Sequence, residues 1–539
     1  MIRSIRFCVR VLDVSSGLSA ILIRSLRLQA KRHTTSQNRS YSDHRVESGT
    51  KTISDLGSST GKGHRATTRS EEPSYSDFKE PKPKVEEEFR APLRSSRVPS
   101  SKLGRLFHYG GLAAGIGWGT ASEAIRRTAS PSDTNGGVDG SMFLNETNVK
   151  RLVDKLTRMR GAALKLGQFM SIQDAKILPP QIEEIFLKVQ TTADSMPFSQ
   201  TESVLKKELG NDWRGRFQSF SQVPFAAASI GQVHRATIEK HSEQIELAIK
   251  VQFPGIFESI TSDLSYLSLI ANSTRLLPSG LFLSKTLEVL GSELKDECDY
   301  LREARCMRRM GEFLKDDDRF EVPSVFEDLT TGLVLSAQFM HGKSLSAAPK
   351  WSQSLRNKIG HNILELSLRE IFEFRLMQTD PNWSNFLWNE KTQKIELIDF
   401  GATREYSREF VDKYFDLLKA GIEEDKEACI EQSKRIGYFT GDESDEMIES
   451  QFKTLRALGT PFRKSTPQPF DFKEQNITDL VRAEIPHMVR LRLTSPPEES
   501  YSLNRKLSGI FLLCSRLGSR IDCLELIEKV YEIHKNSIR

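Results

Sequence analysis

Two kinds of hydrophobic pattern divide the chain after about residue 140. Between 141 and 215 apolar residues recur at helical spacing, first from Asn145 through "LKLGQFMSIQD" and again from Pro180 to Val189. After residue 216, "SIGQVHRATI" and "IELAIKVQ" alternate apolar and polar residues, which predicts the two strands of a β-hairpin. We therefore expect a helical extension followed by a unit that contains a sheet.

The remaining pattern predicts a small lobe with strands and a larger lobe that is mostly helical. A long helix is expected from about Leu281 to Phe313, and "VPSVFED" and "GLVLSAQFMHG" are expected to add two strands. Beyond Gly342 helical patterns dominate, interrupted by "QTDPNWSNFLW" and "KIELIDFGATREY". The predicted fold class is α+β, with an N-lobe at 216–342 and a C-lobe at 343–539.

The N-terminal hundred residues have the composition of a targeting segment and a tether. Residues 1–40 are basic and Ser-rich and contain Asp13 as their single acid, which is typical of a mitochondrial transit peptide. A disordered basic tail is the alternative. Residues 41–101 are rich in Ser, Thr, Lys, Glu and Pro and poor in aliphatic side chains, so we expect a disordered linker there.

An apolar, glycine-rich segment follows at 102–127. Its centre contains no charged residue and carries Gly111, Gly115 and Gly119 at four-residue spacing, the pattern that lets two helices approach closely in lipid. The sequence predicts a transmembrane helix here, and a homodimer through the glycine stripe. A Gly-rich soluble loop or a buried helix is the alternative, because a spanning helix needs about 20 apolar residues.

Composition narrows the class of protein further. The 539 residues suffice for several folded units, and 38% hydrophobic residues can form large cores. The net charge of +5 is modest and its excess lies at the front of the chain, so nucleic-acid binding is not indicated. The six cysteines lack CxxC spacing, which favours a reducing compartment without a zinc site.

Four chemical signals occur in one order along the lobes. Lys250 lies on the predicted strand "LAIK", where an ammonium can meet phosphate oxygens, and Glu297 or Glu303 on the following helix can hold it. Asp380 precedes Asn385 in the spacing D-x-x-x-x-N.

The fourth signal is the tripeptide Asp399-Phe400-Gly401. Each signal alone is weak, but their order matches a protein kinase: strand lysine, helix acid, catalytic-loop Asp and Asn, and the Asp of DFG. Because Mg²⁺ prefers carboxylate and amide oxygens, we assign Asn385 and Asp399 to the metal. Asp380 and Lys250 are assigned to catalysis, with Glu297 or Glu303 as the acid that holds the lysine. The implied cofactors are ATP and Mg²⁺.

Three departures separate the chain from ordinary kinases. The phosphate loop is alanine-rich, and its methyl groups are expected to stiffen the turn and keep phosphate oxygens away from the backbone. The catalytic-loop His and Arg are replaced by Gln378 and Thr379, and only "ATREY" separates Gly401 from a helix that begins near Ser407, so the platform for a peptide substrate is missing. The expected nucleotide-binding residues are Ala226, Ala227, Ala228, Ser229, Lys250, Gln338 and Met340.

Several stretches together resemble the UbiB (ADCK) family of atypical kinase-like proteins. These are "LKLGQ", "PFAAASIGQVH", "AIKVQFPG", "ECDYLREA", "QTDPNWSNF", "LIDFGATREY", "IGYFTGDE" and "LNRKLSGIFLLC". The resemblance runs from about residue 100 to the C-terminus and is greatest to the mitochondrial member required for coenzyme Q (ubiquinone) biosynthesis. It implies a protein-kinase-like bilobal fold whose helical KxGQ extension crosses the active site.

The resemblance also implies roles for four further residues. Lys165 and Gln168 of the KxGQ motif would regulate the site, with Lys165 reaching Glu297 and Asp299 of the ExD motif, while Glu303 partners Lys250. Helical geometry would place Asp299 and Glu303 on one face. Without the resemblance, Lys165 is a solvated lysine on a helix, Gln168 is a helix-capping or surface amide, and Glu297 and Asp299 are an exposed acidic run.

The family implies an ATPase on the matrix face of the mitochondrial inner membrane. Expected partners are ATP, inner-membrane lipids and other coenzyme Q biosynthesis proteins. Two alternative functions stay open: a kinase that phosphorylates a small-molecule or lipid quinone precursor, and a non-catalytic scaffold switched by nucleotide.

Overall fold

A computed structural model describes residues 195–228, 230–274 and 283–538. The expected transit peptide, linker and glycine-rich segment, most of the helical extension, Lys165, Gln168 and Ser229 all lie outside the described residues. Within the described ranges, no helix combines the length and apolar character that a membrane crossing requires.

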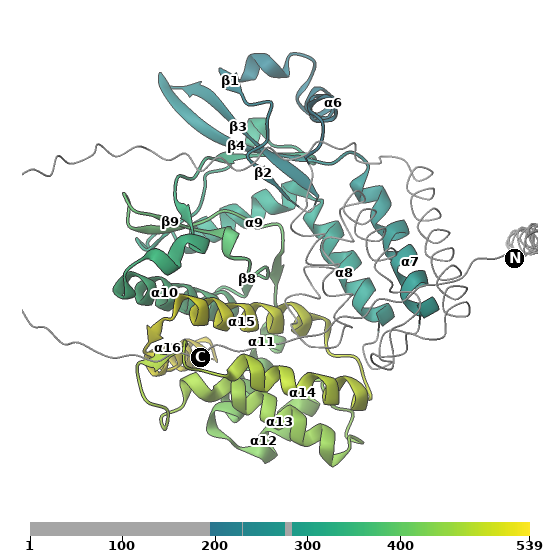
Figure 1. The fold of residues 1–539 in the computed structure, drawn as a ribbon, viewed down its shortest axis with the longest axis vertical. Helices are drawn as coiled ribbons and strands as arrows, with labels where there is room; N and C mark the ends of the chain where they lie inside the picture. The colour runs from purple at the N-terminus through teal and green to yellow at the C-terminus, as the bar shows by residue number, and fades with distance from the viewer. Residues whose placement is uncertain (1–194, 229, 275–282, 539) are drawn as a thin grey trace, which may run out of the picture. The chain divides into compact units, whose positions relative to one another are not determined.

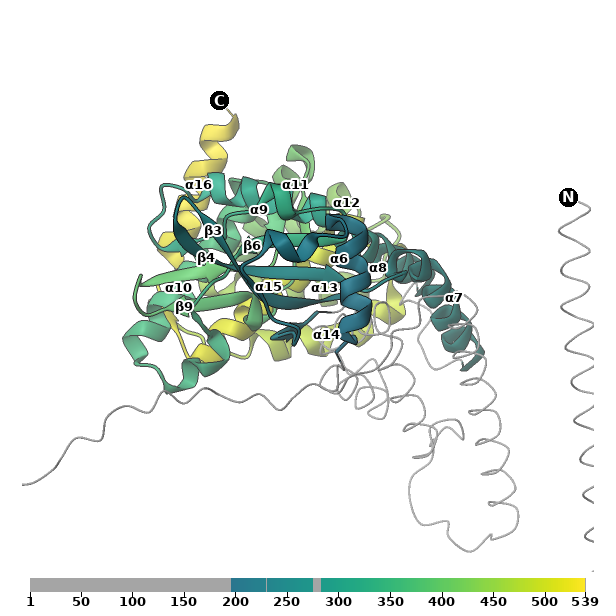
Figure 2. The same cartoon turned by 90° about the horizontal axis from the view of Figure 1, so that it is seen from above.

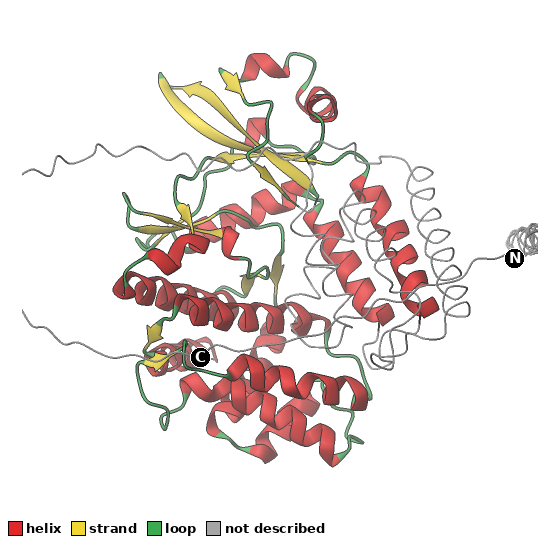
Figure 3. Ribbon diagram, viewed as in Figure 1, coloured by secondary structure: helices red, strands yellow, loops and turns green. Residues whose placement is uncertain are grey.

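The N-lobe contains an antiparallel sheet in the order β1-β3-β4-β6, with β2 paired to β3 (Figures 1 and 3). Its strands are β1 (Ser219–Phe220), β2 (Ala226–Ala227), β3 (Gly231–Lys240), β4 (Glu243–Gln252) and β6 (Val334–Gln338). The predicted hairpin is confirmed, and His241 and Ser242 turn it with positive φ, as a two-residue hairpin turn requires. Helix α6 (Phe198–Leu209) and η1 (Trp213–Arg216) pack beside the sheet (Figure 2).

The predicted long helix from Leu281 to Phe313 is two helices instead. After α7 (Ile256–Thr274), α8 (Leu283–Glu297) ends and α9 (Tyr300–Phe313) begins around Asp299. Asp299 leaves helical geometry, and its carboxylate accepts a hydrogen bond from Arg302 N at 2.9 Å. Asp is a strong N-cap residue. Asp299, which the sequence pattern places inside one long helix, therefore begins a new helix.

The predicted strand in "VPSVFED" is also wrong. The structure has β5 (Phe320–Glu321) before it, a single bridge between Val325 and Ala337, and η3 (Glu327–Leu329) after it. Pro323 lacks a backbone N–H, so this stretch cannot sustain a ladder of hydrogen bonds.

The C-lobe combines helices with short paired strands (Figure 3). One sheet has the order β5-β10-β9-β7, and β8 pairs with β11. The strands are β7 (Lys343–Ser344), β8 (Leu376–Gln378), β9 (Phe386–Asn389), β10 (Lys394–Leu397), β11 (Thr403–Glu405), β12 (Phe470–Asp471) and β13 (Arg520–Ile521).

Helices form the remainder of this lobe. They are η4 (Leu345–Lys350), α10 (Gln353–Phe372), η5 (Trp383–Asn385), α11 (Arg408–Glu423), α12 (Lys426–Ile436), α13 (Asp445–Gly459), η6 (Thr460–Phe462), α14 (Ile477–Leu491), α15 (Glu498–Leu517) and α16 (Cys523–Ile538). The predicted α+β class is confirmed in the described residues. All five described cysteines are buried free thiols, and Trp388 is buried in the core.

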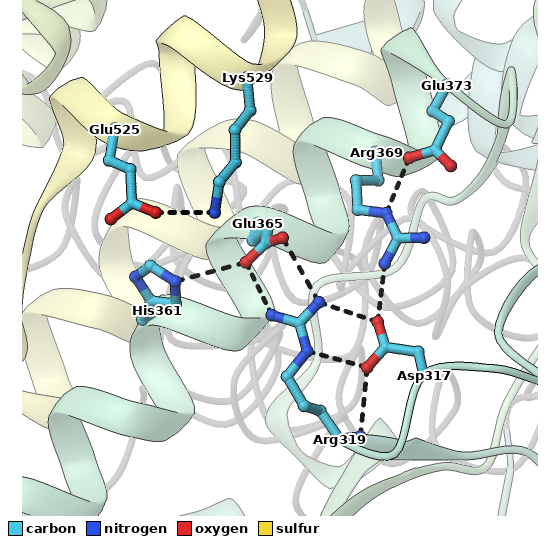
Figure 4. Close-up of polar contacts among 8 residues, drawn as sticks. All are labelled: Asp317, Arg319, His361, Glu365, Arg369, Glu373, Glu525 and Lys529. Carbon is cyan, nitrogen blue, oxygen red and sulfur yellow. Dashed lines mark hydrogen bonds and ion pairs between the residues drawn. The ribbon is translucent and has the colours of Figure 1, made fainter. Parts of the chain in front are cut away.

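A charged cluster ties the loop after α9 to α10 (Figure 4). Arg319 donates to Asp317 at 2.8 Å and to Glu365 at 2.7 Å, and Arg369 donates to Asp317 at 2.8 Å. The hydrogen bond from His361 and then the Arg319 guanidinium hold the pKa of Glu365 well below its usual range. Burial alone would raise the pKa of Asp317, but its bonds to the two arginines keep it low.

Candidate functional site

Lys250 stands at the junction of the lobes, held by an ion pair. It lies near the C-terminal end of β4, opposite Val233 of β3 and Leu335 of β6, so the sheet fixes its backbone on both sides. Its Nζ donates to both carboxylate oxygens of Glu303 on α9, at 2.8 and 2.9 Å. Asp399 Oδ1 lies 3.5 Å from the same Nζ. The predicted pairing of Lys250 with Glu303 is confirmed, and the other predicted candidate, Glu297, does not make it.

Burial and the charges of Lys250, Glu303 and Asp399 on one another determine which of these side chains are ionised. Burial raises the pKa of Glu303 to about 7, and the Lys250 ammonium limits that rise. Burial alone would lower the pKa of Lys250, but the carboxylates of Asp399 and Glu303 together raise it well above its ordinary value. Lys250 therefore stays an ammonium, which is the form that can bind a phosphate oxygen.

Tyr300 is a component that the sequence patterns did not single out. Its buried ring lies beneath Lys250, with Nζ 5.2 Å from the ring centroid, a favourable cation–π contact. A Cβ at Gly231 would lie 2.6 Å from the Tyr300 hydroxyl, so only glycine fits at the start of β3. The stretch "ECDYLREA" indicates its acids as functional, but a tyrosine among them carries no sequence signal for a packing role.

The alanine loop continues the sheet toward this site. Ala226 and Ala227 pair with Val233 and Gln232 as β2, and Ala228 N donates to Gly231 O at 2.8 Å. None of the three alanines has a positive φ. The backbone therefore does not need glycine here, and the alanine methyl groups are accommodated without strain.

Asp380 follows β8 in a loop that carries its own hydrogen bonds. Asp380 Oδ1 accepts from Asn382 N at 3.2 Å, and Asn385 Nδ2 donates to Asp380 O at 3.5 Å. Asn382 in turn caps η5 through its side chain. The predicted spacing thus forms a compact loop in which Asp380 and Asn385 are neighbours.

Asn385 and Asp399 are brought together by the pairing of two strands. Phe386 of β9 lies opposite Leu397 of β10, so Asn385 directly precedes one strand and Asp399 follows the other by two residues. Ile398 N donates to Asn385 O at 3.2 Å, and Gly401 N donates to Asp399 Oδ1 at 3.1 Å.

One carboxylate and one amide oxygen suit Mg²⁺ better than a softer metal. Within the described ranges, no cluster of three or more His, Cys, Asp or Glu side chains could hold a metal ion by itself. Mg²⁺ in phosphoryl-transfer sites is held by one or two carboxylates together with substrate phosphates and water, so the pair Asn385 and Asp399 fits that ion.

Two buried cations of α15, Arg505 and Lys506, support the loop that carries Asp380. The sequence patterns assign no role to either residue. Arg505 donates to both oxygens of Glu293 on α8, at 3.0 and 3.1 Å, and to Thr379 Oγ1 at 3.3 Å. Lys506 lies 3.1 Å from Glu370 of α10. The sequence does carry a signal for their burial, because two adjacent charged residues lie within the otherwise apolar stretch "LNRKLSGIFLLC".

The segment after Gly401 is short, as predicted. Thr403–Glu405 forms β11 against β8, and Ser407 caps α11 at once by accepting a hydrogen bond from Phe410 N. Arg302 of α9 holds this turn by donating to the carbonyl oxygens of Gly401 and Thr403. The turn is therefore fixed to the N-lobe helix and leaves no chain for a peptide-binding segment.

The acids of the ExD motif are in different environments. Glu297 is buried at the end of α8, whereas Asp299 is about half exposed and caps α9. Asp299 and Glu303 are joined by the helical hydrogen bond from Glu303 N to Asp299 O at 3.0 Å, but Asp299 is exposed as the cap of α9 whereas Glu303 is buried against Lys250. An exposed acidic run is wrong for Glu297. The proposed contacts of Lys165 lie outside the described residues.

Gln338 and Met340 lie at the end of β6, on the connection between the lobes. Gln338 pairs with Leu247 of β4 and Gln338 N donates to Ser324 O at 2.9 Å, while Met340 is buried. Their assignment to the nucleotide stays a prediction.

The chain is similar in sequence to known atypical kinase-like proteins. Residues 188–433 match the ABC1 atypical kinase-like domain. The chain is 45% identical over 448 residues to "Atypical kinase COQ8, mitochondrial" of Saccharomyces cerevisiae, covering 83% of this chain and 88% of that protein. It is 47% identical to the Schizosaccharomyces pombe protein of the same name, covering 80% and 70%, and 41% identical to "Atypical kinase COQ8B, mitochondrial" of Danio rerio, covering 84% and 72%.

Proposed function

Because the chain belongs to the UbiB family of ABC1 atypical kinase-like proteins, we propose that it is a mitochondrial Mg²⁺-dependent ATPase that supports coenzyme Q biosynthesis. The observation that carries this proposal is the ion pair of Lys250 and Glu303, 2.8 Å apart, with Asp399 3.5 Å from the same ammonium. A strand lysine held between a helix acid and the DFG carboxylate is the arrangement that phosphoryl transfer from ATP uses.

Each residue has a separate part in the proposed reaction. Lys250 binds phosphate oxygens, and Glu303 keeps its ammonium in position. Asp380 orients the attacking water or acceptor hydroxyl, and Ala226, Ala227, Ala228 and Ser229 cover the nucleotide. Mg²⁺, held by Asn385 and Asp399, would neutralise charge on the phosphates.

Water or a small molecule is the proposed acceptor rather than a peptide. The short turn from Gly401 to Ser407 supports this choice, since its strand β11 packs on β8 and α11 follows directly. We further propose that residues 1–40 direct the chain to mitochondria and that 102–127 associate with the inner membrane, with the kinase-like lobes on the matrix face.

The test compares ATP turnover with coenzyme Q production. The full-length chain and its Asp399→Asn and Asp380→Asn variants are expressed in Saccharomyces cerevisiae cells that lack the COQ8 relative, and the same proteins are purified for ATP hydrolysis with and without Mg²⁺. Asp316→Asn, an exposed carboxylate outside the site, is the matched control. We expect both site variants to lose turnover and coenzyme Q together, while the control retains both.

Two other results would replace the proposal. Normal coenzyme Q with an Asp399→Asn protein that cannot hydrolyse ATP would select a nucleotide-switched scaffold. A phosphorylated quinone precursor that disappears in Asp380→Asn cells would select a lipid or small-molecule kinase.

A further inference from the structure

A cavity separate from the nucleotide site lies in the C-lobe among α13, α14 and α15. Figure 1 shows α14 beside α13, with α15 above them. The cavity has a volume of about 200 Å³, and its apolar wall includes Leu455, Val481, Ile485, Met488 and Phe511. A cavity of roughly 150 Å³ with such a lining accepts benzene, so this one has room for a ring with a short substituent but not for a whole lipid.

Three arginines line this cavity, Arg482, Arg492 and Arg505, and Arg492 differs from the other two in its ion pairing. Among the residues that the structure describes, no carboxylate forms an ion pair with Arg492, and its electrostatic neighbours are Tyr438 and Tyr501. Burial lowers the pKa of Arg492, although a guanidinium remains charged in proteins.

The other arginines of this stretch are paired. Arg490 lies 2.6 Å from Glu446, and Arg482 lies 3.3 Å from Asp479. A partly buried charge is unfavourable unless an opposite charge compensates it. A negatively charged ligand in the cavity would therefore supply the partner that Arg492 lacks among the described carboxylates.

Further polar groups converge on the same space. The Thr478 hydroxyl is buried and has no hydrogen-bond partner within the described part of the chain. The Tyr438 hydroxyl accepts from Asn504 at 3.4 Å, so it is oriented at the cavity wall. A largely apolar cavity with a few placed polar groups is the usual form of a small-molecule site.

We propose that this cavity binds a small apolar carboxylic acid, with its carboxylate on Arg492 and its apolar body between α13 and α14. A guanidinium recognises a carboxylate through two parallel hydrogen bonds, which a neutral molecule of the same shape cannot reproduce. The site goes beyond the proposed function and does not depend on ATP hydrolysis.

The cavity also reaches the group that anchors the catalytic loop. Arg505 is one of its lining residues, and the same side chain bonds Glu293 and Thr379. An occupant would therefore lie next to the residue that holds Thr379, directly before Asp380.

Isothermal titration calorimetry of the full-length chain with 4-propylbenzoate, and with the uncharged 4-propylbenzamide, tests the proposal without any ATP. We expect the benzoate to bind and the amide to bind about tenfold or more weakly, since hydrogen bonds between charged groups have that effect. Arg492→Gln should weaken benzoate binding to the level of the amide, whereas Arg490→Gln, on the paired neighbour, should leave it unchanged.

Val481→Phe reduces the volume of the cavity while Arg492 itself is kept, and it should weaken binding of both compounds. This variant keeps the test decisive if Arg492→Gln lowers the melting temperature of the chain. Equal binding of benzoate and amide, no binding of either, or full benzoate binding by a folded Arg492→Gln or Val481→Phe chain would overturn the proposal.

Discussion

At the scale of single residues, the pair of Lys250 and Glu303 joins the sheet of the N-lobe to α9. Glu303 is almost fully buried, so its charge is tolerated only because the ammonium lies 2.8 Å away. The sequence predicts that a lysine on a strand pairs with an acid on the following helix. The residue pattern leaves Glu297 and Glu303 open as the partner of Lys250; the family resemblance implies Glu303, and the structure confirms it.

Replacing Glu303 by Gln should leave Lys250 poorly positioned. We expect the turnover number for ATP to fall by about 10- to 100-fold, because small misplacements of a catalytic group have effects of that size. Glu312→Gln, an exposed acid on the same helix, should be without effect in the same steady-state assay. Equal turnover in the two variants would show that the ion pair has no catalytic role.

Ala228→Gly tests the steric explanation of the alanine loop. The variant should let phosphate oxygens approach the backbone, change nucleotide affinity several-fold and permit self-phosphorylation. Binding of a fluorescent ADP analogue and incorporation of labelled phosphate measure the two effects. If both stay as in the unchanged chain, the methyl groups do not determine nucleotide binding.

At the scale of elements, α15 is the support of the catalytic loop. Arg505 and Lys506 point to the loop and α10, and the close packing of Gly509 on Pro381 brings the helix backbone against the loop. Their partners, Glu293, Glu370 and Thr379, lie far away in the chain. Periodicity could therefore predict the helix, but not which of its charges are buried.

Arg505→Met should remove both hydrogen bonds that Arg505 donates to the buried carboxylate of Glu293. We expect the free energy of unfolding to fall by about 3–5 kcal/mol, together with loss of ATP turnover. The double variant Glu293→Met/Arg505→Met removes both charges and should recover most of the stability while turnover stays low. Recovery of turnover along with stability would limit Arg505 to a structural role.

The elements themselves were predictable to different degrees. The hairpin of β3 and β4, strand β6 and the start of α11 at Ser407 followed from local patterns. The break between α8 and α9 did not, because an Asp within a helical pattern can be either a surface residue or a cap, and only tertiary packing decides.

At the scale of the whole molecule, the charged cluster in Figure 4 connects the loop after α9 to the C-lobe helix α10. The pKa values of Asp317 and Glu365 are both lowered in the folded chain. In acid the unfolded chain therefore binds more protons than the folded one, so this part of the stability is present above the ordinary carboxyl pKa and is lost as the pH falls below it.

Arg319→Met should lower the free energy of unfolding at neutral pH by about 2 kcal/mol and reduce its loss in acid. Urea unfolding at about pH 7 and about pH 4 measures both effects. The control is Arg308→Met, which removes an exposed ion pair with Glu327 and should change stability by less than about 1 kcal/mol. An Arg319→Met chain with unchanged acid sensitivity would exclude the cluster as its source.

The most direct measurement is the affinity of the full-length chain for ATP as a function of Mg²⁺ concentration, with the Asp399→Asn variant beside it. If Lys250, Asn385 and Asp399 all bind one complex of Mg²⁺ and ATP, the unchanged chain should bind ATP tightly only when Mg²⁺ is present. The Asp399→Asn variant should lose this dependence on Mg²⁺. Identical Mg²⁺ curves for the two proteins, or no binding of ATP by the unchanged chain, would contradict binding of one complex by these three residues.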